Sequence, residues 1–324
     1  MMGKALVARA PGGPEVMEWV DLPDGRPGAG EVLVRHSAIG VNFLDIYYRS
    51  GLYPWPEATM IPGAEAAGLV EAVGEDVTDL RLGARVAYVL PFGAYRETRV
   101  VPAARLVPLP DGVRDSAIAS ALLKGLTAQY LVTASYAVQP GDTVLVHAAA
   151  GGVGLLLGPW LAALGATAIG TAGGPEKVAL ARKHGYAHVI DYRAGDFVAE
   201  VARLTGGAGC AAVYDSIGAD TWRGSLKCLR RRGVLVNFGQ SSGMIRDFAL
   251  SDLAAGSLTA IRPVLFDYIA TRAELLSRSA DLFARIADGT LRLDIVNTRP
   301  LHEAGAVHAD IEARRTMGST VLLP

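Results

Sequence analysis

The stretch Thr143-Val144-Leu145-Val146-His147, followed by Ala148-Ala149-Ala150-Gly151-Gly152-Val153-Gly154, decides the fold of this 324-residue chain. The first five residues predict an apolar strand, and residues 152–164 predict a helix. The loop between them matches the dinucleotide fingerprint G-x-G-x-x-G, with Ala149 at the first glycine position. Gly151 lets the backbone approach a pyrophosphate, Gly154 lets the helix pack close to the strand, and Gly152 and Val153 lie between them. The helix N-terminus supplies free N–H groups and a positive dipole end for phosphates.

Apolar strands and helices alternate downstream of this loop. The predicted strands are 143–148, 167–171, 189–191, 211–216 and 233–238, and the predicted helices are 152–164, 175–185, 196–205 and 221–229. Apolar strands alternating with helices indicate a parallel sheet covered on both faces. The fold class is therefore α/β, with a doubly wound Rossmann domain. Before it, residues 117–134 are rich in Ala and Leu at helical spacing.

The loop after the second strand of this domain indicates which dinucleotide binds. An NAD site places an Asp or Glu there for the ribose 2′-OH. This chain instead has Thr171-Ala172-Gly173-Gly174, with Lys177 one turn into the next helix and Tyr192 closing the third strand. A small-residue loop without an acid, beside a cation, suits a 2′-phosphate because the pairing is charge-assisted. Gly173, Gly174, Lys177 and Tyr192 are therefore candidate cofactor residues, and NADPH is favoured over NADH. Lys177 alone could equally be an ordinary surface lysine.

The first 124 residues show a different pattern of apolar residues, glycines and prolines from this domain. Short apolar or alternating runs at 3–8, 31–40, 68–74, 85–90 and 95–101 are separated by Gly and Pro, and 43–50 predicts a short helix. Frequent short strands separated by Gly- and Pro-containing turns predict a mostly antiparallel, barrel-like domain. A polar helix at 272–288 and an apolar strand at 320–323 follow the Rossmann domain, and we expect that strand to rejoin the first domain. The predicted division is 1–124 with 265–324 for the barrel-like domain and 125–264 for the dinucleotide-binding domain.

Composition excludes several classes of protein. The formal charge is −1, so nucleic acid is not expected as a partner. The longest basic run, Arg230-Arg231-Arg232, is interpreted as a solvated helix end. No stretch approaches the ~18 apolar residues of a membrane span, and no signal peptide is evident. The two cysteines, Cys210 and Cys228, are too few for a disulfide framework and predict core positions in a cytoplasmic protein.

Several motifs along the chain carry a family resemblance. They include Val41-Asn42-Phe43-Leu44-Asp45, Pro62-Gly63-Ala64-Glu65-Ala66-Ala67-Gly68, Lys124-Gly125-Leu126-Thr127-Ala128, Val213-Tyr214-Asp215-Ser216-Ile217-Gly218 and Asn237-Phe238-Gly239-Gln240-Ser241-Ser242-Gly243. Together with the domain order, they resemble the medium-chain dehydrogenase/reductase superfamily and, within it, the quinone oxidoreductase (zeta-crystallin-like) family. The resemblance covers essentially the whole chain and implies a GroES-like first domain.

The resemblance also implies roles for individual residues. It places Asn42 and Thr127 near the nicotinamide end of the cofactor. It places along the cofactor cleft Tyr192, Ser216, Phe238, Gly239, Ser241, Phe266 and Arg314. Gly239 has independent support, because open α/β sheets bind ligands at strand ends. Taken alone, Asn42 could be a turn residue, Thr127 an ordinary helix residue and Phe238 a core residue.

Comparison with zinc-dependent relatives predicts that no metal binds. They have a Cys in the segment matching Gly40-Val41-Asn42, and a histidine where this chain has Ala64. Of the zinc ligands only Glu65 remains, and no cysteine precedes Cys210. A catalytic zinc needs about three protein ligands. The six histidines show no paired metal spacing, because Gly185 is expected to break the helix between His184 and His188.

Without a Lewis acid, readily reduced acceptors such as quinones or conjugated enones are the expected substrates. The leading hypothesis is a zinc-independent NADPH:quinone oxidoreductase working in a cleft between the two domains. An NADPH-dependent alkenal or enone reductase is the alternative, and an NADPH-binding structural or RNA-binding crystallin-like protein is a third. Tyr47 and Tyr53 are candidate pocket walls that could hydrogen-bond a carbonyl oxygen or stack on a ring, or could be ordinary half-buried tyrosines. With Asn42 and Thr127 they form the predicted catalytic set.

The family resemblance implies a homodimer. A physical rationale is the apolar strand at 233–238, expected to be an edge that a second copy covers.

Overall fold

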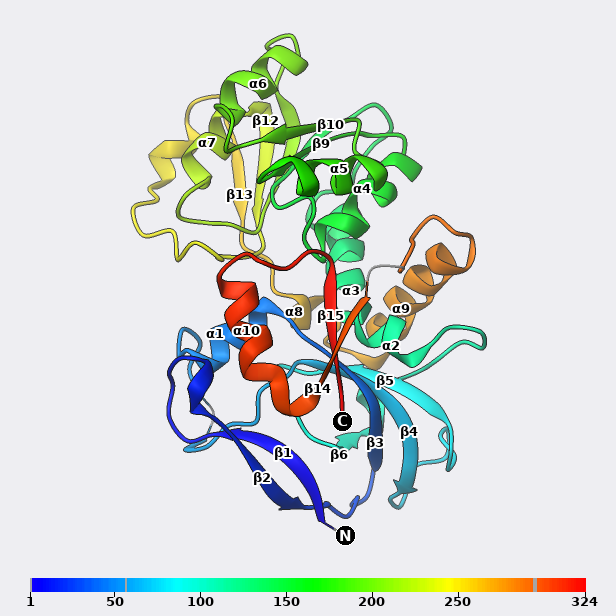
Figure 1. The fold of residues 1–324 in the computed structure, drawn as a ribbon. Coiled ribbons are helices and arrows are strands. Elements are labelled where there is room, and N and C mark those ends of the chain that lie inside the picture. Colours follow the sequence, from blue (N-terminus) through cyan, green and yellow to red (C-terminus); the bar gives the residue numbers. More distant parts are fainter. Residues whose placement is uncertain (1, 56, 294–295) are drawn as a thin grey trace. The chain divides into compact units, whose positions relative to one another are not determined.

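The computed structural model describes residues 2–55, 57–293 and 296–324, which form two compact units (Figure 1). Unit 1 comprises Met1–Leu123, Ala270–Phe283 and Leu293–Pro324, and unit 2 comprises Lys124–Ile269 and Ala284–Arg292. The predicted division differs in assigning residues 124, 265–269 and 284–292 to the first domain. The border at 283/284 falls within helix α9 (Arg272–Ala287), whose first residues belong to unit 1 and whose last residues belong to unit 2.

Unit 1 is the mostly antiparallel domain that the sequence predicts. Its strands are β1 (Met2–Ala8), β2 (Met17–Pro23), β3 (Glu31–Gly40), β4 (Glu65–Val73), β5 (Arg85–Val89), β6 (Thr98–Pro102), β7 (Leu106–Pro108), β14 (Val296–Pro300) and β15 (Ser319–Leu323). Among the described residues β1 and β2 form a separate ribbon, and the larger sheet has the order β14-β15-β3-β4-β5-β7, with β6 also paired to β3. Its core is aliphatic and aromatic, with Val32, Ile39, Tyr88 and Leu106 fully buried.

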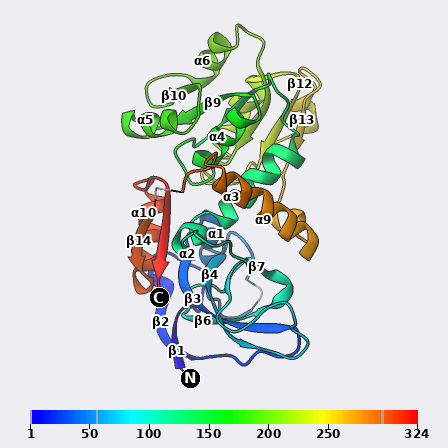
Figure 2. The same ribbon diagram turned by 90° about the vertical axis from the view of Figure 1, so that its right-hand side faces the viewer.

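Unit 1 contains the helices α1 (Phe43–Arg49), α2 (Asp115–Ala119) and α10 (Ala304–Glu312), and the first part of α9. Helix α2 contacts β3, β4 and β5, and α10 contacts β14. Short 3-10 turns cover Pro14–Val16, Ala103–Arg105 and Leu301–Glu303. Figure 2 shows α10 beside β14 and β15. Strand β15 pairs antiparallel with β3, with Leu322 opposite Ile39, so the prediction that the last strand rejoins the first domain is confirmed.

Unit 2 is the predicted doubly wound domain. Its sheet has the order β10-β9-β8-β11-β12-β13, and all its strand pairs are parallel. The strands are β8 (Thr143–Val146), β9 (Thr167–Ala172), β10 (His188–Asp191), β11 (Cys210–Asp215), β12 (Leu229–Asn237) and β13 (Thr259–Ile261). The chain first builds outward from β8 through β9 to β10 and then returns to add β11 on the other side of β8. The topological switch point therefore lies between β8 and β11.

Helices cover both faces of this sheet. They are α4 (Gly154–Ala163), α5 (Pro175–Lys183), α6 (Phe197–Leu204) and α7 (Trp222–Lys227), preceded by α3 (Leu122–Tyr130) and followed by α8 (Leu265–Tyr268). A 3-10 turn covers Leu250–Leu253. Helices α4 and α5 contact each other and β9, whereas α6 and α7 contact each other and the strands β10 to β12 (Figure 1). Cys210 and Cys228 are buried free thiols, and burial raises the pKa of each to about 12, so the prediction of core positions is confirmed.

Three predictions about unit 2 and its borders were wrong. The run 117–134 is not one helix: it is divided into α2, α3 and a π-helical turn at Leu131–Ser135, and Ser120 ends α2 by donating its hydroxyl to the Ala117 carbonyl at 2.7 Å. Arg230 to Arg232 are not a helix end but the exposed start of β12. Strand β12 is not an edge, because β13 pairs with it on the side away from β11.

Candidate functional site

The glycine loop joins β8 to α4 and is built for close backbone approach. A side chain added at Gly154 would lie 2.4 Å from the Ala148 carbonyl oxygen and 2.7 Å from that of Ala149. Only glycine therefore lets the first turn of α4 sit directly on the end of the strand. Ala148 has a φ of 54°, a region that non-glycine residues rarely adopt and that is common at functional sites. The backbone N–H of buried Ala149 donates to the Thr171 carbonyl at 2.9 Å, which ties this loop to the end of β9.

The loop after β9 forms a second, small-residue platform. A side chain on Gly173 would lie 2.5 Å from the Tyr192 hydroxyl and 3.1 Å from Arg193 Nε, and Gly174 has a φ of 90°. Lys177 lies in the first turn of α5, which begins at Pro175. The loop thus has two cations close by, of which the sequence analysis named Lys177 and missed Arg193. Arg193 follows Tyr192 directly, but its approach to Gly173 depends on how β10 pairs with β9.

The acid nearest to this platform is Asp191, at the end of β10 rather than β9. Its Oδ1 accepts hydrogen bonds from the backbone N–H groups of Gly174 and Arg193, both at 3.0 Å. The bond from Gly174 is the main reason that the pKa of Asp191 is lowered. Because this carboxylate holds the loop in shape from the third strand, it does not occupy the position that binds a ribose 2′-OH in NAD sites.

The loops after β11 and β12 pack against each other at the same end of the sheet. The Ser241 N–H donates to the Ser216 carbonyl at 3.2 Å, and the Phe238 N–H donates to the Asp215 carbonyl at 2.9 Å. A side chain on Gly239 would lie 2.7 Å from the Ser216 carbonyl oxygen. The structure therefore brings together Ser216, Phe238, Gly239 and Ser241, as the family resemblance implies.

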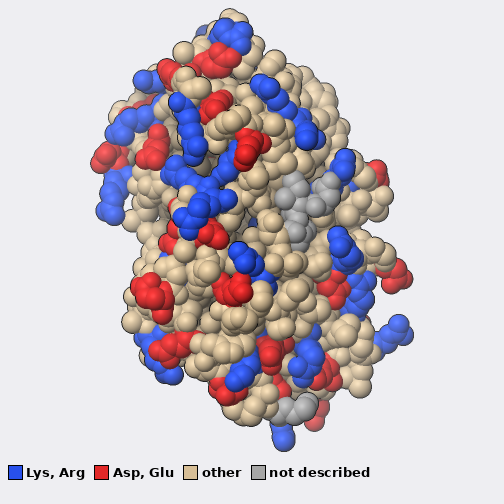
Figure 3. Space-filling view, viewed as in Figure 1, with Lys and Arg blue, Asp and Glu red and all other residues tan. Residues whose placement is uncertain are grey.

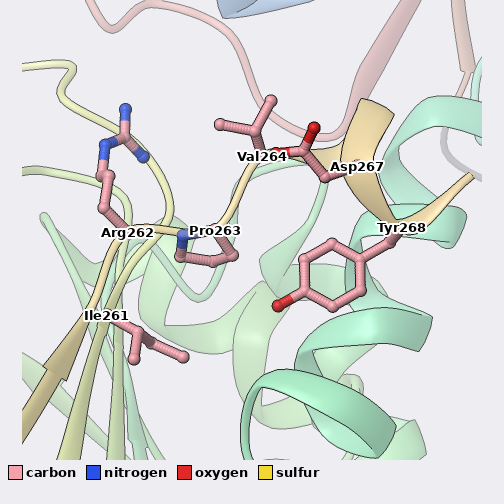
Figure 4. Close-up of a pocket in the computed structure, with 6 residues that line it drawn as sticks. All are labelled: Ile261, Arg262, Pro263, Val264, Asp267 and Tyr268. Atoms are coloured by element: carbon pink, nitrogen blue, oxygen red, sulfur yellow. The ribbon is translucent and has the colours of Figure 1, made fainter. Parts of the chain in front are cut away.

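A hollow of about 290 Å³ lies where the chain leaves β13, lined by Ile261, Arg262, Pro263, Val264, Asp267 and Tyr268 (Figure 4). The Arg262 guanidinium donates to the Asn237 carbonyl at 2.9 Å. Tyr268 stacks on buried Tyr130 of α3, with ring centroids 4.3 Å apart and 8° between planes. Phe266 lies in the same short helix as Tyr268, and Thr127 lies buried one turn before Tyr130. Arg262 and Asp267 are polar groups of this hollow that the sequence analysis did not single out.

In unit 1, Asn42 precedes α1 and is buried. Its side-chain amide donates to Glu65 Oε1 at 2.9 Å, and the other Glu65 oxygen accepts from the Leu123 N–H at 2.7 Å. The Asp45 carboxylate accepts from the Asn42 N–H at 2.8 Å and from the Tyr95 hydroxyl at 3.0 Å, which fixes the start of the helix. Glu65, the one zinc ligand that this chain retains, thus contacts Asn42 and Leu123, and Ala64 beside it offers no ligand atom. Among the described residues, no group of three His, Cys, Asp or Glu side chains is placed to hold a metal ion.

Tyr47 and Tyr53 lie in one aromatic cluster of unit 1. Their ring centroids are 5.3 Å apart, Tyr48 packs edge-on against Tyr53 at 5.5 Å, and the Tyr53 N–H donates to the Tyr47 carbonyl. Both side chains are half-buried. Arg314 also belongs to unit 1, where it follows α10 with a φ of 58°. Asn42, Tyr47, Tyr53 and Arg314 therefore lie in one unit, and the remaining predicted site residues lie in the other.

A Rossmann sheet with a glycine loop at its switch point, joined to a GroES-like domain, defines a nicotinamide-dependent oxidoreductase of the medium-chain type. Two family models match the chain accordingly: an alcohol dehydrogenase GroES-like domain at residues 28–111 and a zinc-binding dehydrogenase at residues 152–280. The quinone oxidoreductase of Pseudomonas aeruginosa is 48% identical over the full length of both chains. The 2-haloacrylate reductase of a Burkholderia species is 45% identical, covering 100% of this chain and 99% of that protein.

Solved structures give the same result. The crystal structure of Escherichia coli quinone oxidoreductase complexed with NADPH superimposes with a TM-score of 0.97 at 42% identity, covering 99% of this chain and 100% of that one. The chain belongs to the quinone oxidoreductase family of the medium-chain dehydrogenase/reductase superfamily. Among the described residues, no helix is long and apolar enough to cross a membrane.

Proposed function

We propose that this protein is a zinc-independent NADPH:quinone oxidoreductase. The observation that carries the proposal is the pair of loops at the carboxyl end of the unit 2 sheet: the glycine loop for the pyrophosphate and the acid-free loop beside Lys177 and Arg193 for the 2′-phosphate. Relatives that are quinone oxidoreductases, one of them crystallised with NADPH, support the same function.

The residues present fit the cofactor. Gly151 would let the pyrophosphate approach the backbone, Gly154 lets α4 pack on the end of β8, and the N-terminus of α4 would offer its N–H groups to the phosphates. When bound, NADPH supplies a hydride, which with one proton reduces a quinone to a hydroquinone. Within unit 2, Ser216, Gly239 and Ser241 would line the cofactor beside its nicotinamide half, and the family resemblance assigns Thr127 to the nicotinamide end. The resemblance assigns the same end to Asn42 of unit 1, whose side chain is held by Glu65.

The aromatic cluster of Tyr47 and Tyr53 supplies the proposed quinone walls. Two half-buried rings at 5.3 Å can stack on a flat acceptor, and each hydroxyl can donate a hydrogen bond to a quinone oxygen. A quinone already accepts electrons readily, so orientation and exclusion of water suffice for its reduction. Metal activation is not required, and the side chains around Glu65 do not provide a zinc ligand set.

Steady-state kinetics with NADPH test this proposal. We expect a higher kcat/KM for a benzoquinone or naphthoquinone than for an alkenal at equal enzyme concentration. NADPH oxidation with alkenals at clearly higher kcat/KM than with every quinone would overturn it.

The second candidate is a reductase of α,β-unsaturated carbonyl compounds. The specific observation in its favour is the 2-haloacrylate reductase relative, which is nearly as similar as the quinone oxidoreductases. Hydride addition to a conjugated acid needs a cation near the carboxylate, and Arg262 in the hollow after β13 is placed to serve that purpose. Reduction of 2-chloroacrylate that is lost in Arg262→Gln, with quinone reduction retained, would favour this candidate.

A structural or RNA-binding role is the third possibility. Figure 3 shows a group of Lys and Arg side chains on the upper part of the face in view, with acidic side chains around it. The formal net charge of −1 gives the protein no strong overall attraction for RNA, which favours an enzyme. NADPH binding without oxidation across a quinone panel would favour the third possibility.

We further propose a cytoplasmic homodimer. Strand β13 is the outer strand of the unit 2 sheet among the described residues, and the segment around it exposes apolar side chains: Met244, Phe248, Leu250 and Val264. An unpaired edge beside exposed apolar residues is the type of surface that a second copy covers. The two buried thiols, kept reduced, suit a cytoplasmic location.

A further inference from the structure

A chain of buried polar side chains crosses the switch point of the unit 2 sheet. It begins at Thr171 at the end of β9, passes through His147 after β8 and Ser225 of α7, and ends at Asp215 at the end of β11. The exposed fractions of these four side chains are 3%, 2%, 0% and 0%. Polar groups buried so completely destabilise the fold unless every hydrogen bond is made, so a complete chain across three strands requires an explanation.

The hydrogen bonds of this chain have one consistent direction. The Ser225 hydroxyl donates to Asp215 Oδ2 at 2.9 Å, so its oxygen is free to accept from His147 Nε2–H at 3.0 Å. His147 Nδ1 then has no hydrogen and accepts from the Thr171 hydroxyl at 2.9 Å. The imidazole is therefore neutral, in agreement with a pKa lowered by burial. Phe197 packs edge-on against the ring at 5.0 Å and fixes its plane.

Both ends of this hydrogen-bond chain lie in loops of the proposed cofactor site. Thr171 begins the acid-free loop that contains Gly173 and Gly174, and its carbonyl also accepts from Ala149 of the glycine loop. At the other end, Asp215 Oδ1 accepts from the N–H groups of Ile217 at 2.8 Å and Gly218 at 3.0 Å. Asp215 also accepts from the Thr221 hydroxyl. The hydrogen-bond chain thus joins the loop after β9, which in the proposed function binds the 2′-phosphate, to the loop after β11, which would contact the part that NADPH and NADH share.

We propose that His147 is a positioning residue for the dinucleotide: through Thr171 it sets the loop that recognises the 2′-phosphate, and through Ser225 and Asp215 it sets the loop at the nicotinamide side. This inference rests on the proposed function, because it assigns the residues beneath the same cofactor site. His147 does not contact the cofactor in this arrangement. Its effect is transmitted by two hydroxyl groups that can be removed separately.

Removing a hydroxyl from one half of the hydrogen-bond chain should have a different effect on dinucleotide binding from removing one from the other half. Thr171→Val keeps the shape of the side chain and removes the hydroxyl that holds the 2′-phosphate loop. We expect the Kd for NADPH to rise about five-fold, the effect of one net hydrogen bond, while the Kd for NADH changes by less than about two-fold. Ser225→Ala separates His147 from Asp215 on the shared side, so we expect both Kd values to rise by similar factors.

Fluorescence titration of NADPH and NADH into the full-length protein measures these values. Thr171→Ser, which keeps the hydroxyl, should restore wild-type affinity. Thr133→Val is the matched control, because that hydroxyl donates to the Gln129 carbonyl within its own helical turn. Circular dichroism and thermal midpoints identify any variant that fails to fold. If Thr171→Val is one of them, Thr171→Ala, which removes the same hydroxyl, provides the test in its place.

The outcomes separate the two proposals. Wild-type protein that binds neither dinucleotide would refute the proposed function itself. If the wild type binds NADPH but Thr171→Val changes the NADPH and NADH affinities by the same factor, the hydrogen-bond chain is merely structural and the positioning role is wrong. A fall in the NADPH preference in Thr171→Val alone, restored in Thr171→Ser, supports it.

Discussion

At the scale of single residues, we expect the preference for NADPH to depend on the charges beside the loop after β9. Lys177→Ala removes one cation from the first turn of α5, while the helix N-terminus and Arg193 remain. We expect the Kd for NADPH to rise about 10-fold, since a charge-assisted hydrogen bond contributes about 1.5–3 kcal/mol, and the Kd for NADH to stay within about two-fold. Isothermal titration measures both. Lys183→Ala, in the last turn of the same helix, is the control. Equal losses for the two dinucleotides would contradict the 2′-phosphate assignment.

Buried histidines make a second prediction at this scale. His36 accepts from the Tyr88 hydroxyl at Nε2 and donates from Nδ1 to the Arg96 carbonyl, and burial lowers its pKa to about 3. Burial likewise lowers the pKa of His308 to about 3. Between pH 6.5 and pH 3 the unfolded chain therefore binds more protons than the folded one. The free energy of unfolding should fall as pH falls through this window, by about 1.4 kcal/mol per pH unit for each histidine.

Urea unfolding at pH 7.5, 6.0 and 5.0 checks this dependence. His36→Gln should reduce the slope by the contribution of one histidine. An identical slope in wild type and His36→Gln would show that His36 is protonated in the folded state.

The sequence predicted the loops after β8 and β9, with their glycines, because the spacing of these residues is local. It missed Arg193, whose position depends on pairing between β10 and β9. It also could not find that Asn42 donates to Glu65, since the two residues meet only when β3 and β4 pair. Local patterns reveal backbone requirements, but long-range side-chain partners depend on the register of distant strands.

At the scale of elements, α4 depends on Gly154 at its start. Gly154→Ala would place a methyl group 2.4 Å from a backbone oxygen, which cannot move aside as a flexible side chain would. We expect the Kd for NADPH to rise at least about 10-fold and the thermal midpoint to fall by about 5 °C. Gly195→Ala is the control, because that added methyl group meets open space at an ordinary φ. Unchanged binding in Gly154→Ala would show that the helix does not need its close approach to the strand.

The elements that were predicted and those that were not differ in burial. The strands of unit 2 are nearly continuous apolar runs, and the predicted β3 matches the observed Glu31–Gly40. Strand β2 was not predicted, because its residues are exposed or half-buried and its apolar and polar residues do not alternate regularly. Strands β7 and β13 have three residues each, too few to show a period. The division of 117–134 was missed because a break at Ser120 leaves the Ala/Leu pattern intact.

At the scale of the whole molecule, the proposed homodimer would form through the edge of the unit 2 sheet. The Leu250 side chain, 82% exposed, is the most exposed large apolar residue beside β13. Leu250→Glu should shift a dimer toward monomer at about 10 µM, because burying a carboxylate in an apolar contact is unfavourable. Leu82→Glu, at a 64% exposed leucine of unit 1, should remain dimeric. Size-exclusion chromatography with light scattering gives the mass directly. A wild-type monomer at this concentration would refute the homodimer.

The pairing of β15 with β3 has a consequence for how the protein is made. Unit 2 is assembled almost entirely from one continuous stretch, so it can fold while the ribosome is still synthesising the rest of the chain. Unit 1 cannot finish folding at that stage, since the β3 residue Ile39 pairs with Leu322 of β15, which is synthesised last. During translation β3 therefore carries an unsatisfied edge that is prone to aggregation. Ribosome-bound chains stalled before residue 319 should accordingly expose the first unit to proteases and chaperones while the dinucleotide-binding unit is already protected.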